Sequence, residues 1–441
     1  MTAPSPSIMP AKEDEWRKFS PMLLRDLCQC AACIHHSTRQ KLFSTTDIPR
    51  DIRVQSIAPN PTSTDVVDIL WDGDVPGYDA GHITSLDTQW LRDICKDGAI
   101  PGPFQGRPMQ AAPWNAQTLS PREFEYDEYM RDDTVLYSAT EQLQTHGLVF
   151  ITNVPSSEKS VSAIAERIGP LKSTFYGDTW DVRTVPSAIN AAYTSSDLGF
   201  HSDLLYFQNP AHIQLLHCMQ ASCTGGASVF VDAFKCAVDL YTADPDAFDI
   251  LATLLVNYHY KHPDSNLYSA TKPVIETRPN RIGDVVYHSL PEFLDAWQKN
   301  REHLRQSVGT EISSLRVMDC LEKINWGPPF MAPFSLQPES MEQARSCATV
   351  VESLNWKIDA WHVAAQKFSD LLHQRENLYE RTMQPGDCVL FDNTRILHAR
   401  GAFDSTDVEK VRWLRGTYLD KEPFLSKLRV LKNKFGNVGR L

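Results

Sequence analysis

The sequence predicts an α+β protein whose larger part is a double-stranded β-helix, or jelly-roll, with peripheral helices. After residue 120, many short strand-like segments alternate with helical ones, a pattern typical of a distorted jelly-roll barrel. Before it, a smaller β-rich region with three clustered cysteines ends at a Pro- and Gly-rich stretch, residues 99–106. We therefore expect a flexible lead-in at 1–20, a small domain at 21–100, a linker at 101–120 and the jelly-roll domain at 121–441.

The small domain is expected to contain a strand and a helix. Residues 66–71 form a mainly apolar, strand-like segment. Residues 87–95 place Trp90, Leu91 and Ile94 at helical spacing, and Asp87 precedes them as a plausible N-cap.

The larger domain is expected to mix helices on its outside with buried strands. Helical patterns cover residues 133–145, 160–168, 233–254 and 338–375. Strand patterns cover residues 147–152, 212–219, 227–232, 388–392 and 410–419, and several strand-like pieces broken by polar loops fall within 256–335. A turn at residues 224–226 joins two of these strands.

Composition restricts the class of partner. The chain has 441 residues, 42% hydrophobic and 22% charged, which is ordinary for a globular enzyme. Its net charge of −12 argues against nucleic acid or an anionic membrane as the main partner, because binding phosphate requires clustered Lys and Arg. No apolar run approaches the ~18 residues of a membrane span. Residues 1–18 lack the features of a signal or transit peptide, so a cytoplasmic protein is expected.

Three cysteines crowd into a Cys-x-Cys-x-x-Cys pattern at Cys28, Cys30 and Cys33. Three soft thiolates within six residues suit tetrahedral Zn²⁺, which needs one further ligand. The candidates for that fourth ligand are His35, His36, His82 and Cys95. The alternative is three reduced thiols in a helical turn, but a filled site would be structural and would stabilise a region with little core of its own.

A second metal pattern lies at His201-Ser202-Asp203. On extended backbone, side chains two residues apart point to the same side. One imidazole and one carboxylate are two of the ligands in a 2-His-1-carboxylate facial triad, which leaves positions open on Fe(II). The best candidate for the third ligand is His398, 195 residues after Asp203. Such a motif alone is more often a surface Asp beside a half-buried His.

Several segments in order carry a family resemblance: residues 24–33, 175–180, 192–194, 201–203, 214–218, 224–226, 392–398 and 412–418. Together they resemble the gamma-butyrobetaine hydroxylase and trimethyllysine hydroxylase branch of the Fe(II)/2-oxoglutarate dioxygenases, which includes the taurine dioxygenase-like enzymes. The resemblance implies a zinc domain whose fourth ligand is His82, ahead of Trp90-Leu91. It also implies an iron site at His201, Asp203 and His398, and a homodimer.

The resemblance further implies 2-oxoglutarate as co-substrate, with ascorbate as a candidate reductant. The far carboxylate of 2-oxoglutarate needs a fixed cation, and Arg binds carboxylates bidentately. Arg412 lies 14 residues after His398, as in the family, and Arg400 and Arg415 are its competitors. Ser228 stands where relatives offer a Thr hydroxyl. Turnover would release succinate and CO₂ and oxidise an aliphatic C–H bond of the substrate.

The implied substrate is a small betaine or amino acid, with gamma-butyrobetaine-type hydroxylation favoured. Tyr176, Trp180, Tyr193 and Tyr418 match aromatic residues that cage a trimethylammonium group, although such residues also pack cores without binding a cation. Asn190 resembles an Asn that contacts the substrate carboxylate in butyrobetaine enzymes.

Two departures from the sequences of the named enzymes leave more than one substrate class to consider. Leu204 replaces a Tyr of the vertebrate-type butyrobetaine enzymes, and residues 258–333 follow neither named enzyme closely. A trimethyllysine hydroxylase, or an oxygenase of specialised metabolism that hydroxylates, desaturates or cyclises another small amino acid, is therefore an alternative. A non-catalytic binding protein is disfavoured by the intact triad, and a chromatin oxygenase with a zinc reader domain by the acidic charge.

Overall fold

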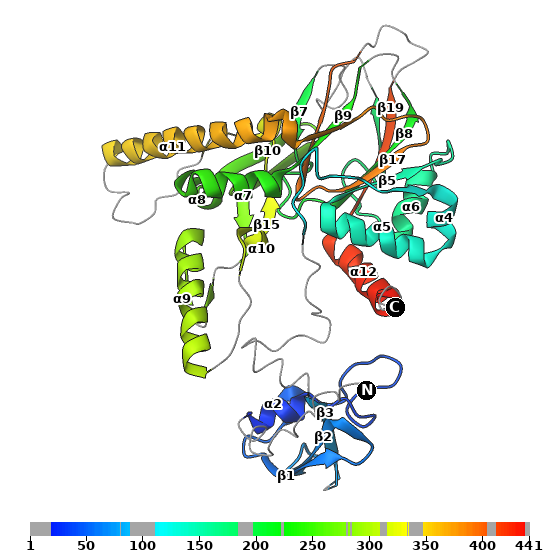
Figure 1. The fold of residues 1–441 in the computed structure, drawn as a ribbon, viewed down its shortest axis with the longest axis vertical. Helices are drawn as coiled ribbons and strands as arrows, with labels where there is room; N and C mark the ends of the chain where they lie inside the picture. Colours follow the sequence, from blue (N-terminus) through cyan, green and yellow to red (C-terminus); the bar gives the residue numbers. More distant parts are fainter. Residues whose placement is uncertain are drawn as a thin grey trace, which may run out of the picture. The chain divides into compact units, whose positions relative to one another are not determined.

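A computed structural model describes residues 19–79, 81–88, 111–183, 197–221, 225–278, 281–282, 285–308, 315–332, 334, 347–403 and 412–436. The chain divides into two compact units, one built mainly from residues 1–106 and one mainly from residues 107–441. Each unit has a hydrophobic cluster of its own. The structure confirms the predicted α+β class (Figure 1).

The smaller unit is built on a three-stranded antiparallel sheet in the order β1-β2-β3. Its elements are α2 (Pro21–Asp26), η1 (Thr45–Asp47), β1 (Arg53–Asn60), β2 (Ser63–Asp72) and β3 (Ile83–Asp87). Val67, Ile69 and Trp71 alternate along β2 and are buried on one face, as the strand predicted at 66–71 requires. The helix predicted at 87–95 lies, beyond Thr88, outside the described residues.

The larger unit contains two sheets packed face to face, the arrangement of a jelly-roll. The six-stranded sheet runs β4 (Glu123–Glu125), β5 (Leu148–Thr152), β17 (Cys388–Asp392), β8 (Ile213–Gln220), β19 (Trp413–Leu419), β6 (Thr179–Arg183). The four-stranded sheet runs β16 (Leu378–Arg381), β9 (Ser228–Asp232), β18 (Ile396–Arg400), β7 (Leu198–His201). Phe150, Leu216 and Phe391 of the first sheet pack with Phe230 and Ile396 of the second.

Helices cover the outer face of the six-stranded sheet. They are α4 (Tyr126–Arg131), α5 (Asp133–His146), α6 (Ser160–Ile168) and α12 (Lys421–Phe435) (Figure 1). They pack on sheet residues that point away from the space between the two sheets, among them Ile213, Leu215 and Leu390. The helices predicted at 133–145 and 160–168 are thereby confirmed. Helix α5 ends at Gly147, whose φ is +76°, and a Cβ there would lie 2.8 Å from Cγ1 of Ile396.

On the other side of the larger unit, α7 (Ala233–Ala243), α8 (Pro245–Thr253) and α11 (Cys347–His373) pack together (Figure 1). The helical pattern predicted over 233–254 is confirmed, but it forms two helices, α7 and α8. Pro245 begins a new helix and the Asp244 carboxylate accepts the Ala247 N–H at 3.0 Å as its cap. A proline cannot donate to the preceding turn, so α7 must end before it. The helix predicted at 338–375 is present as α11, and residues 335–346 lie outside the described part.

The segment between α8 and α11 is more helical than the strand-like pieces predicted there. It contains β10 (Val256–His262), β11 (Asn266–Lys272), β12 (Ile275–Thr277), β13 (Arg281–Ile282), β14 (Val285–Val286), α9 (Leu290–Val308), α10 (Val317–Cys320), β15 (Leu321–Ile324) and η3 (Pro328–Phe330), and η5 (Arg375–Asn377) follows α11. The sequence analysis also missed α4 and α12.

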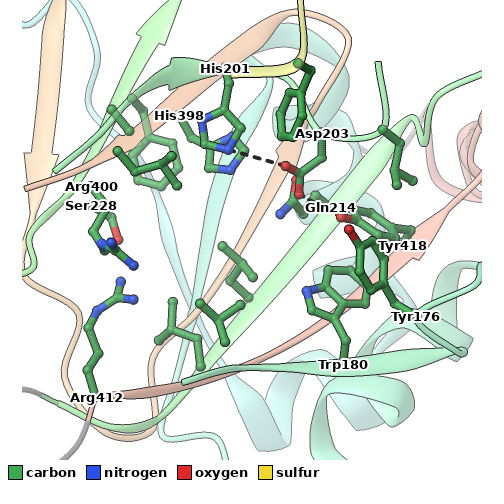
Figure 2. Close-up of a pocket in the computed structure, with 18 of the residues that line it drawn as sticks. Tyr176, Trp180, His201, Asp203, Gln214, Ser228, His398, Arg400, Arg412 and Tyr418 are labelled. Atoms are coloured by element: carbon green, nitrogen blue, oxygen red, sulfur yellow. Dashed lines mark hydrogen bonds and ion pairs between the residues drawn. The ribbon is translucent and has the colours of Figure 1, made fainter. Parts of the chain in front are cut away.

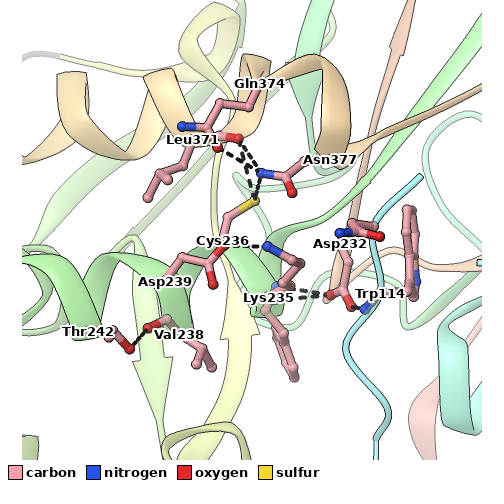
Figure 3. Close-up of polar contacts among 12 residues, drawn as sticks. Trp114, Asp232, Lys235, Cys236, Val238, Asp239, Thr242, Leu371, Gln374 and Asn377 are labelled. Carbon is pink, nitrogen blue, oxygen red and sulfur yellow. Dashed lines mark hydrogen bonds and ion pairs between the residues drawn. The ribbon is translucent and has the colours of Figure 1, made fainter. Parts of the chain in front are cut away.

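A buried polar network fixes the end of the four-stranded sheet. At the end of β9, the Asp232 carboxylate accepts the backbone N–H groups of Phe234 and Trp114, each at 3.2 Å (Figure 3). The same carboxylate pairs with the Arg395 guanidinium at 2.7 Å, and both side chains are almost fully buried. Because Arg395 immediately precedes β18, this pair fixes the start of the strand that carries His398.

Candidate functional site

His201 and His398 are directly opposite each other on neighbouring strands. Strand β7 pairs antiparallel with β18, and the register places His398 against His201. Opposed residues of an antiparallel pair project to the same face of the sheet. The two imidazole centroids are 4.2 Å apart, which is close enough for one metal ion to bind both rings.

Asp203 joins the two histidines from a turn and not from the strand. Strand β7 ends at His201, so the prediction of one extended segment through Asp203 is wrong. The Ser202 N–H donates to the Trp326 carbonyl at 2.7 Å, and Leu204 adopts the left-handed region with φ +61°. This turn brings Oδ1 of Asp203 to 3.3 Å from Nε2 of His201.

Asp203 is held at its backbone and at its carboxylate. The Asn393 side chain accepts the Asp203 N–H at 2.7 Å and donates to the Asp203 carbonyl at 3.1 Å. The Tyr418 hydroxyl donates to Oδ2 of Asp203 at 2.7 Å. The carboxylate orientation is therefore determined by groups from two different strands, β7 and β19, and from the β17–β18 turn.

The electrostatics of this group suit a metal. Burial and the neighbouring His201 lower the pKa of His398 to about 3, so this imidazole is neutral at physiological pH. Burial alone would raise the pKa of Asp203, but its hydrogen bonds with His201 and with the Tyr418 hydroxyl hold that pKa below its usual range. Nδ1 of His398 is buried and has no hydrogen-bond partner among the described residues.

The donor atoms of His201, Asp203 and His398 all lie within 4.8 Å of one another. Two neutral imidazoles and one ionised carboxylate are the donor set that suits Fe(II) and leaves coordination positions open for other ligands. The residues present therefore fit an iron site.

A cavity open to solvent adjoins these three side chains. In Figure 2, Arg400, Arg412 and Ser228 lie at one end, while Tyr176, Trp180 and Tyr418 lie at the other. Further lining residues are Leu204, Tyr206, Gln214 and Phe330. The structure thus gathers most of the predicted iron, co-substrate and substrate residues around one space.

The arginine end of the cavity is strongly cationic. Arg412 is 6% exposed, and burial together with the charge of Arg400 lowers its pKa to about 10. No described residue forms a hydrogen bond or ion pair with the Arg412 guanidinium. Two buried guanidiniums close together favour an anionic ligand, and a carboxylate matches their geometry. Arg415 is engaged elsewhere, because its guanidinium binds the Asp181 carboxylate at 2.8 Å.

The opposite end has aromatic walls. The rings of Trp180 and Tyr418 are stacked, with centroids 3.9 Å apart and planes 22° from parallel. Gly416 allows this packing, because a Cβ there would lie 2.6 Å from Trp180. The hydroxyls of Tyr176 and Tyr206 lie 3.2 Å apart and bond to each other. The walls consequently present mainly ring surface to the cavity.

A second metal group lies in the smaller unit. Nε2 of His82 is 3.6 Å from Sγ of Cys28 and 3.4 Å from Sγ of Cys30 and of Cys33. Tetrahedral zinc with ordinary Zn–S and Zn–N bonds places such ligand atoms about 3.6 Å apart. The four side chains therefore fit a closed zinc site.

Asp74 and Arg25 surround this group. Oδ2 of Asp74 binds Nδ1 of His82 at 2.6 Å, and its Oδ1 binds Nε of Arg25 at 2.5 Å. Arg25 also donates to Sγ of Cys33 at 3.4 Å. The carboxylate fixes the histidine tautomer with Nε2 facing the thiols, which is the usual arrangement around a zinc-binding histidine.

Some predicted residues are not in these groups. His35 and His36 stack on each other, with centroids 4.9 Å apart, and neither belongs to the metal group. Cys95, Asn190 and Tyr193 lie outside the described residues. The predicted roles of Asn190 and Tyr193 therefore stay predictions.

The cavity residues that the sequence did not reveal include two aromatic side chains and one buried glutamine. Tyr206 and Phe330 line the aromatic end, and Gln214 lies beside Asp203 and Tyr418 in Figure 2. Gln214 is 2% exposed, and its side-chain carbonyl has no partner among the described residues. A signal for Gln214 existed, since a glutamine in the apolar run 213–219 must be paired or functional.

Comparison with known proteins agrees with this geometry. Residues 105–418 match the taurine catabolism dioxygenase TauD, TfdA family, and residues 11–76 match the gamma-butyrobetaine hydroxylase-like N-terminal family. A dioxygenase of Strobilurus tenacellus is 31% identical over 94% of this chain and 86% of its own. Gamma-butyrobetaine dioxygenase of Pseudomonas sp. is 26% identical over 94% of this chain and 90% of its own. Trimethyllysine dioxygenase of Bos taurus is 24% identical over 94% and 83%.

Solved structures give a coarser likeness. A taurine dioxygenase from Burkholderia xenovorans is 14% identical, covers 70% of this chain and 88% of its own, and has a TM-score of 0.41. PvcB, an Fe, alpha-ketoglutarate dependent oxygenase, is 16% identical, covers 72% and 94%, and has a TM-score of 0.42. None of the described helices is long and apolar enough to cross a membrane.

The chain belongs to the TauD/TfdA family and is an Fe(II)/2-oxoglutarate-dependent dioxygenase with a Cys₃His group for structural zinc.

Proposed function

We propose that this enzyme binds iron through His201, Asp203 and His398 and 2-oxoglutarate through Arg412, and oxidises an aliphatic C–H bond of a small betaine or amino acid. Gamma-butyrobetaine-type hydroxylation is the favoured reaction, with release of succinate and CO₂. The observation that carries this proposal is the cavity itself, because the three metal donors lie between a cationic end and an aromatic end.

The chain divides the work among its residues. Arg412 binds the far carboxylate of 2-oxoglutarate and thereby aims its keto acid at the three metal donors, with Arg400 and Ser228 beside it. The apolar walls exclude water and hold the substrate. Iron with 2-oxoglutarate supplies the activation of O₂. Ascorbate would serve as the reductant.

Aromatic walls support a trimethylammonium substrate. The faces of Tyr176, Trp180 and Tyr418 line one end of the cavity, and cation–π attraction favours a quaternary ammonium there. Relatives include gamma-butyrobetaine dioxygenases, and Asn190 and Tyr193 are proposed to complete the substrate site.

A second candidate is a trimethyllysine hydroxylase or an oxygenase of another small amino acid, by hydroxylation, desaturation or cyclisation. The observation that favours it is Leu204, which lines the cavity in place of the Tyr of vertebrate-type butyrobetaine enzymes. Tyr206, two residues later, lines the same end and its hydroxyl binds Tyr176. The aromatic wall of this cavity therefore has its tyrosine two residues later in the chain than the Tyr that Leu204 replaces.

A substrate panel coupled to succinate release tests the proposal. Gamma-butyrobetaine, trimethyllysine and unmethylated amino acids are compared with iron-loaded enzyme, and His201→Ala serves as the matched inactive protein. We expect gamma-butyrobetaine to stimulate succinate formation and His201→Ala to lose that stimulation while retaining its melting temperature. Stimulation by unmethylated amino acids alone would exclude the cage, and full turnover by His201→Ala would exclude the iron assignment.

The molecule's organisation belongs to the same proposal. We infer a cytoplasmic homodimer in which zinc, held by Cys28, Cys30, Cys33 and His82, stabilises a domain at residues 21–100 joined through a linker at 101–120 to the catalytic domain. Trp356 on α11 is 66% exposed, and exposed aromatic side chains are enriched at subunit interfaces. Sedimentation of the purified enzyme as a monomer would contradict the dimer.

A further inference from the structure

The two oxygens of the Asp203 carboxylate have different surroundings. Oδ1 lies 3.3 Å from Nε2 of His201, on the side of the metal donors. Oδ2 accepts the Tyr418 hydroxyl at 2.7 Å, a short and charge-assisted hydrogen bond. The carboxylate is thus turned with one oxygen toward the histidines and the other toward a phenol.

Resting on the proposed function, we propose that Tyr418 is a positioning residue that makes Asp203 a ligand through one oxygen only. A free carboxylate can bind a metal through one or both oxygens. By occupying Oδ2, the phenol keeps Asp203 from closing on the metal with both. The coordination positions that a 2-His-1-carboxylate site must leave open for its other ligands therefore stay open.

Few other groups compete for this task. The Asn393 side chain fixes the Asp203 backbone and does not contact the carboxylate oxygens. Gln214 lies opposite Tyr418 in the strand register, and its side-chain amide forms no hydrogen bond with Asp203 among the described residues. The Tyr418 hydroxyl is the only donor to Oδ2 that the described residues provide.

The same residue also forms part of the substrate wall. The Tyr418 ring is stacked on Trp180, and both rings line the cavity. A substrate that presses on this pair would act on the phenol and, through it, on Asp203. Tyr418 therefore links the occupancy of the aromatic end to the orientation of a metal ligand, which a simple wall residue would not do.

The variant Tyr418→Phe separates the positioning of Asp203 by the hydroxyl from the wall formed by the ring, because it keeps the ring and removes only the hydroxyl. Tyr176→Phe is the matched control: it is the same change in the same cavity, but its hydroxyl binds Tyr206 and not Asp203. The melting temperature of the larger unit verifies that both variants fold.

Metal affinity is measured with Mn²⁺, titrated into zinc-loaded, iron-free protein without O₂ and followed by the electron paramagnetic resonance signal of free Mn²⁺. Mn²⁺ prefers nitrogen and oxygen ligands, so it does not displace zinc from the cysteine thiolates. Groups that orient metal ligands typically contribute about 10- to 100-fold to affinity. Because the freed Oδ2 of Tyr418→Phe can close on the ion and displace a bound water, we expect the water-proton relaxation caused by bound Mn²⁺ to fall in Tyr418→Phe and to keep its wild-type value in Tyr176→Phe. The Mn²⁺ affinity should change by about 10-fold or more in Tyr418→Phe and by less than about 2-fold in Tyr176→Phe.

Two other outcomes have separate meanings. If Tyr418→Phe binds Mn²⁺ like wild type and only the KM for the organic substrate rises, Tyr418 is a wall residue and the inference is overturned. If His201→Ala binds Mn²⁺ as tightly as wild type, the iron assignment fails instead. The failure of the inference and the failure of the proposed function are thus distinguishable.

Discussion

At the scale of single residues, the cavity combines a cationic end with an aromatic end around three metal donors. The cysteine group could be predicted because three cysteines rarely lie so close together in a sequence. The His-x-Asp motif is weak alone, and the triad could be predicted only through the family segments that surround it. Gln214 and the Tyr418 hydroxyl could not be assigned roles, because they depend on strand register. A sequence does not show that Tyr418, on a strand of the other sheet, reaches the Asp203 carboxylate, or that Arg415 turns outward to Asp181.

Arg412 is expected to control the affinity for 2-oxoglutarate. Arg412→Gln removes the buried positive charge that would pair with its far carboxylate, and truncating one partner of such a pair costs about 2 kcal/mol or more. We expect the KM for 2-oxoglutarate to rise by roughly 30-fold or more at unchanged zinc content. Steady-state succinate formation measures it.

Arg415→Gln is the matched control for that measurement. Its guanidinium lies outside the cavity and binds Asp181 and the Glu158 carbonyl. The KM for 2-oxoglutarate should change by less than about 3-fold, since exposed ion pairs contribute little. A large effect of Arg415→Gln with none of Arg412→Gln would reverse the two roles.

At the scale of elements, strands and turns determine which residues meet. Helices α5 and α6 were predictable because their caps and apolar faces are local signals. Helix α9 was missed because its sequence is largely polar, and the break between α7 and α8 was missed although Pro245 marks it. The end of β7 at His201 could not be predicted, because the turn that follows depends on contacts with distant residues.

Strand β11 supports that turn through Lys272, which donates to the Phe207 carbonyl at 2.7 Å. Burial lowers the pKa of Lys272 to about 8, so the folded state releases this proton at a lower pH than the unfolded state does. Between these two pKa values the unfolded state binds more protons, and stability rises with pH.

We expect this rise to be lost in Lys272→Met. From pH 7 to pH 9.5, wild type should gain about 2 kcal/mol in the free energy of unfolding relative to this variant. Urea unfolding at the two pH values measures the difference. Lys261→Met, at an exposed position of β10, should follow wild type. If the free energy of unfolding of Lys272→Met changed with pH as much as that of wild type, burial would not destabilise the charged form of Lys272.

At the scale of the whole molecule, the two units are stabilised differently, because the larger unit has extensive hydrophobic clusters and the smaller unit has little core and a metal group. The jelly-roll class was predictable from the run of short strands, and the family resemblance implied it as well. The order of the strands in each sheet was not predictable, because neighbours such as β18 and β7 are separated by most of the larger unit. The smaller unit has one modest cluster, which includes Leu24, Ile57 and Trp71, and a metal group.

Zinc removal should therefore destabilise the smaller unit alone. A small core with a structural metal derives much of its folding free energy from metal binding. We expect calorimetry to show one unfolding transition for each unit. A strong zinc chelator should lower the melting temperature of the smaller unit, or abolish its transition, and leave the transition of the larger unit unchanged. A single transition that shifts as a whole on chelation would show that the two units unfold together.

The placement of the metal ligands along the chain has a consequence for biosynthesis. The zinc ligands are complete once His82 has been synthesised, whereas the iron site needs His398, roughly 300 residues later. At about 5–20 residues per second, the ribosome takes roughly 15–60 s to add that stretch. Because His201 and Asp203 have no third ligand until then, the zinc ligand set is complete on a nascent chain long before the iron ligand set is.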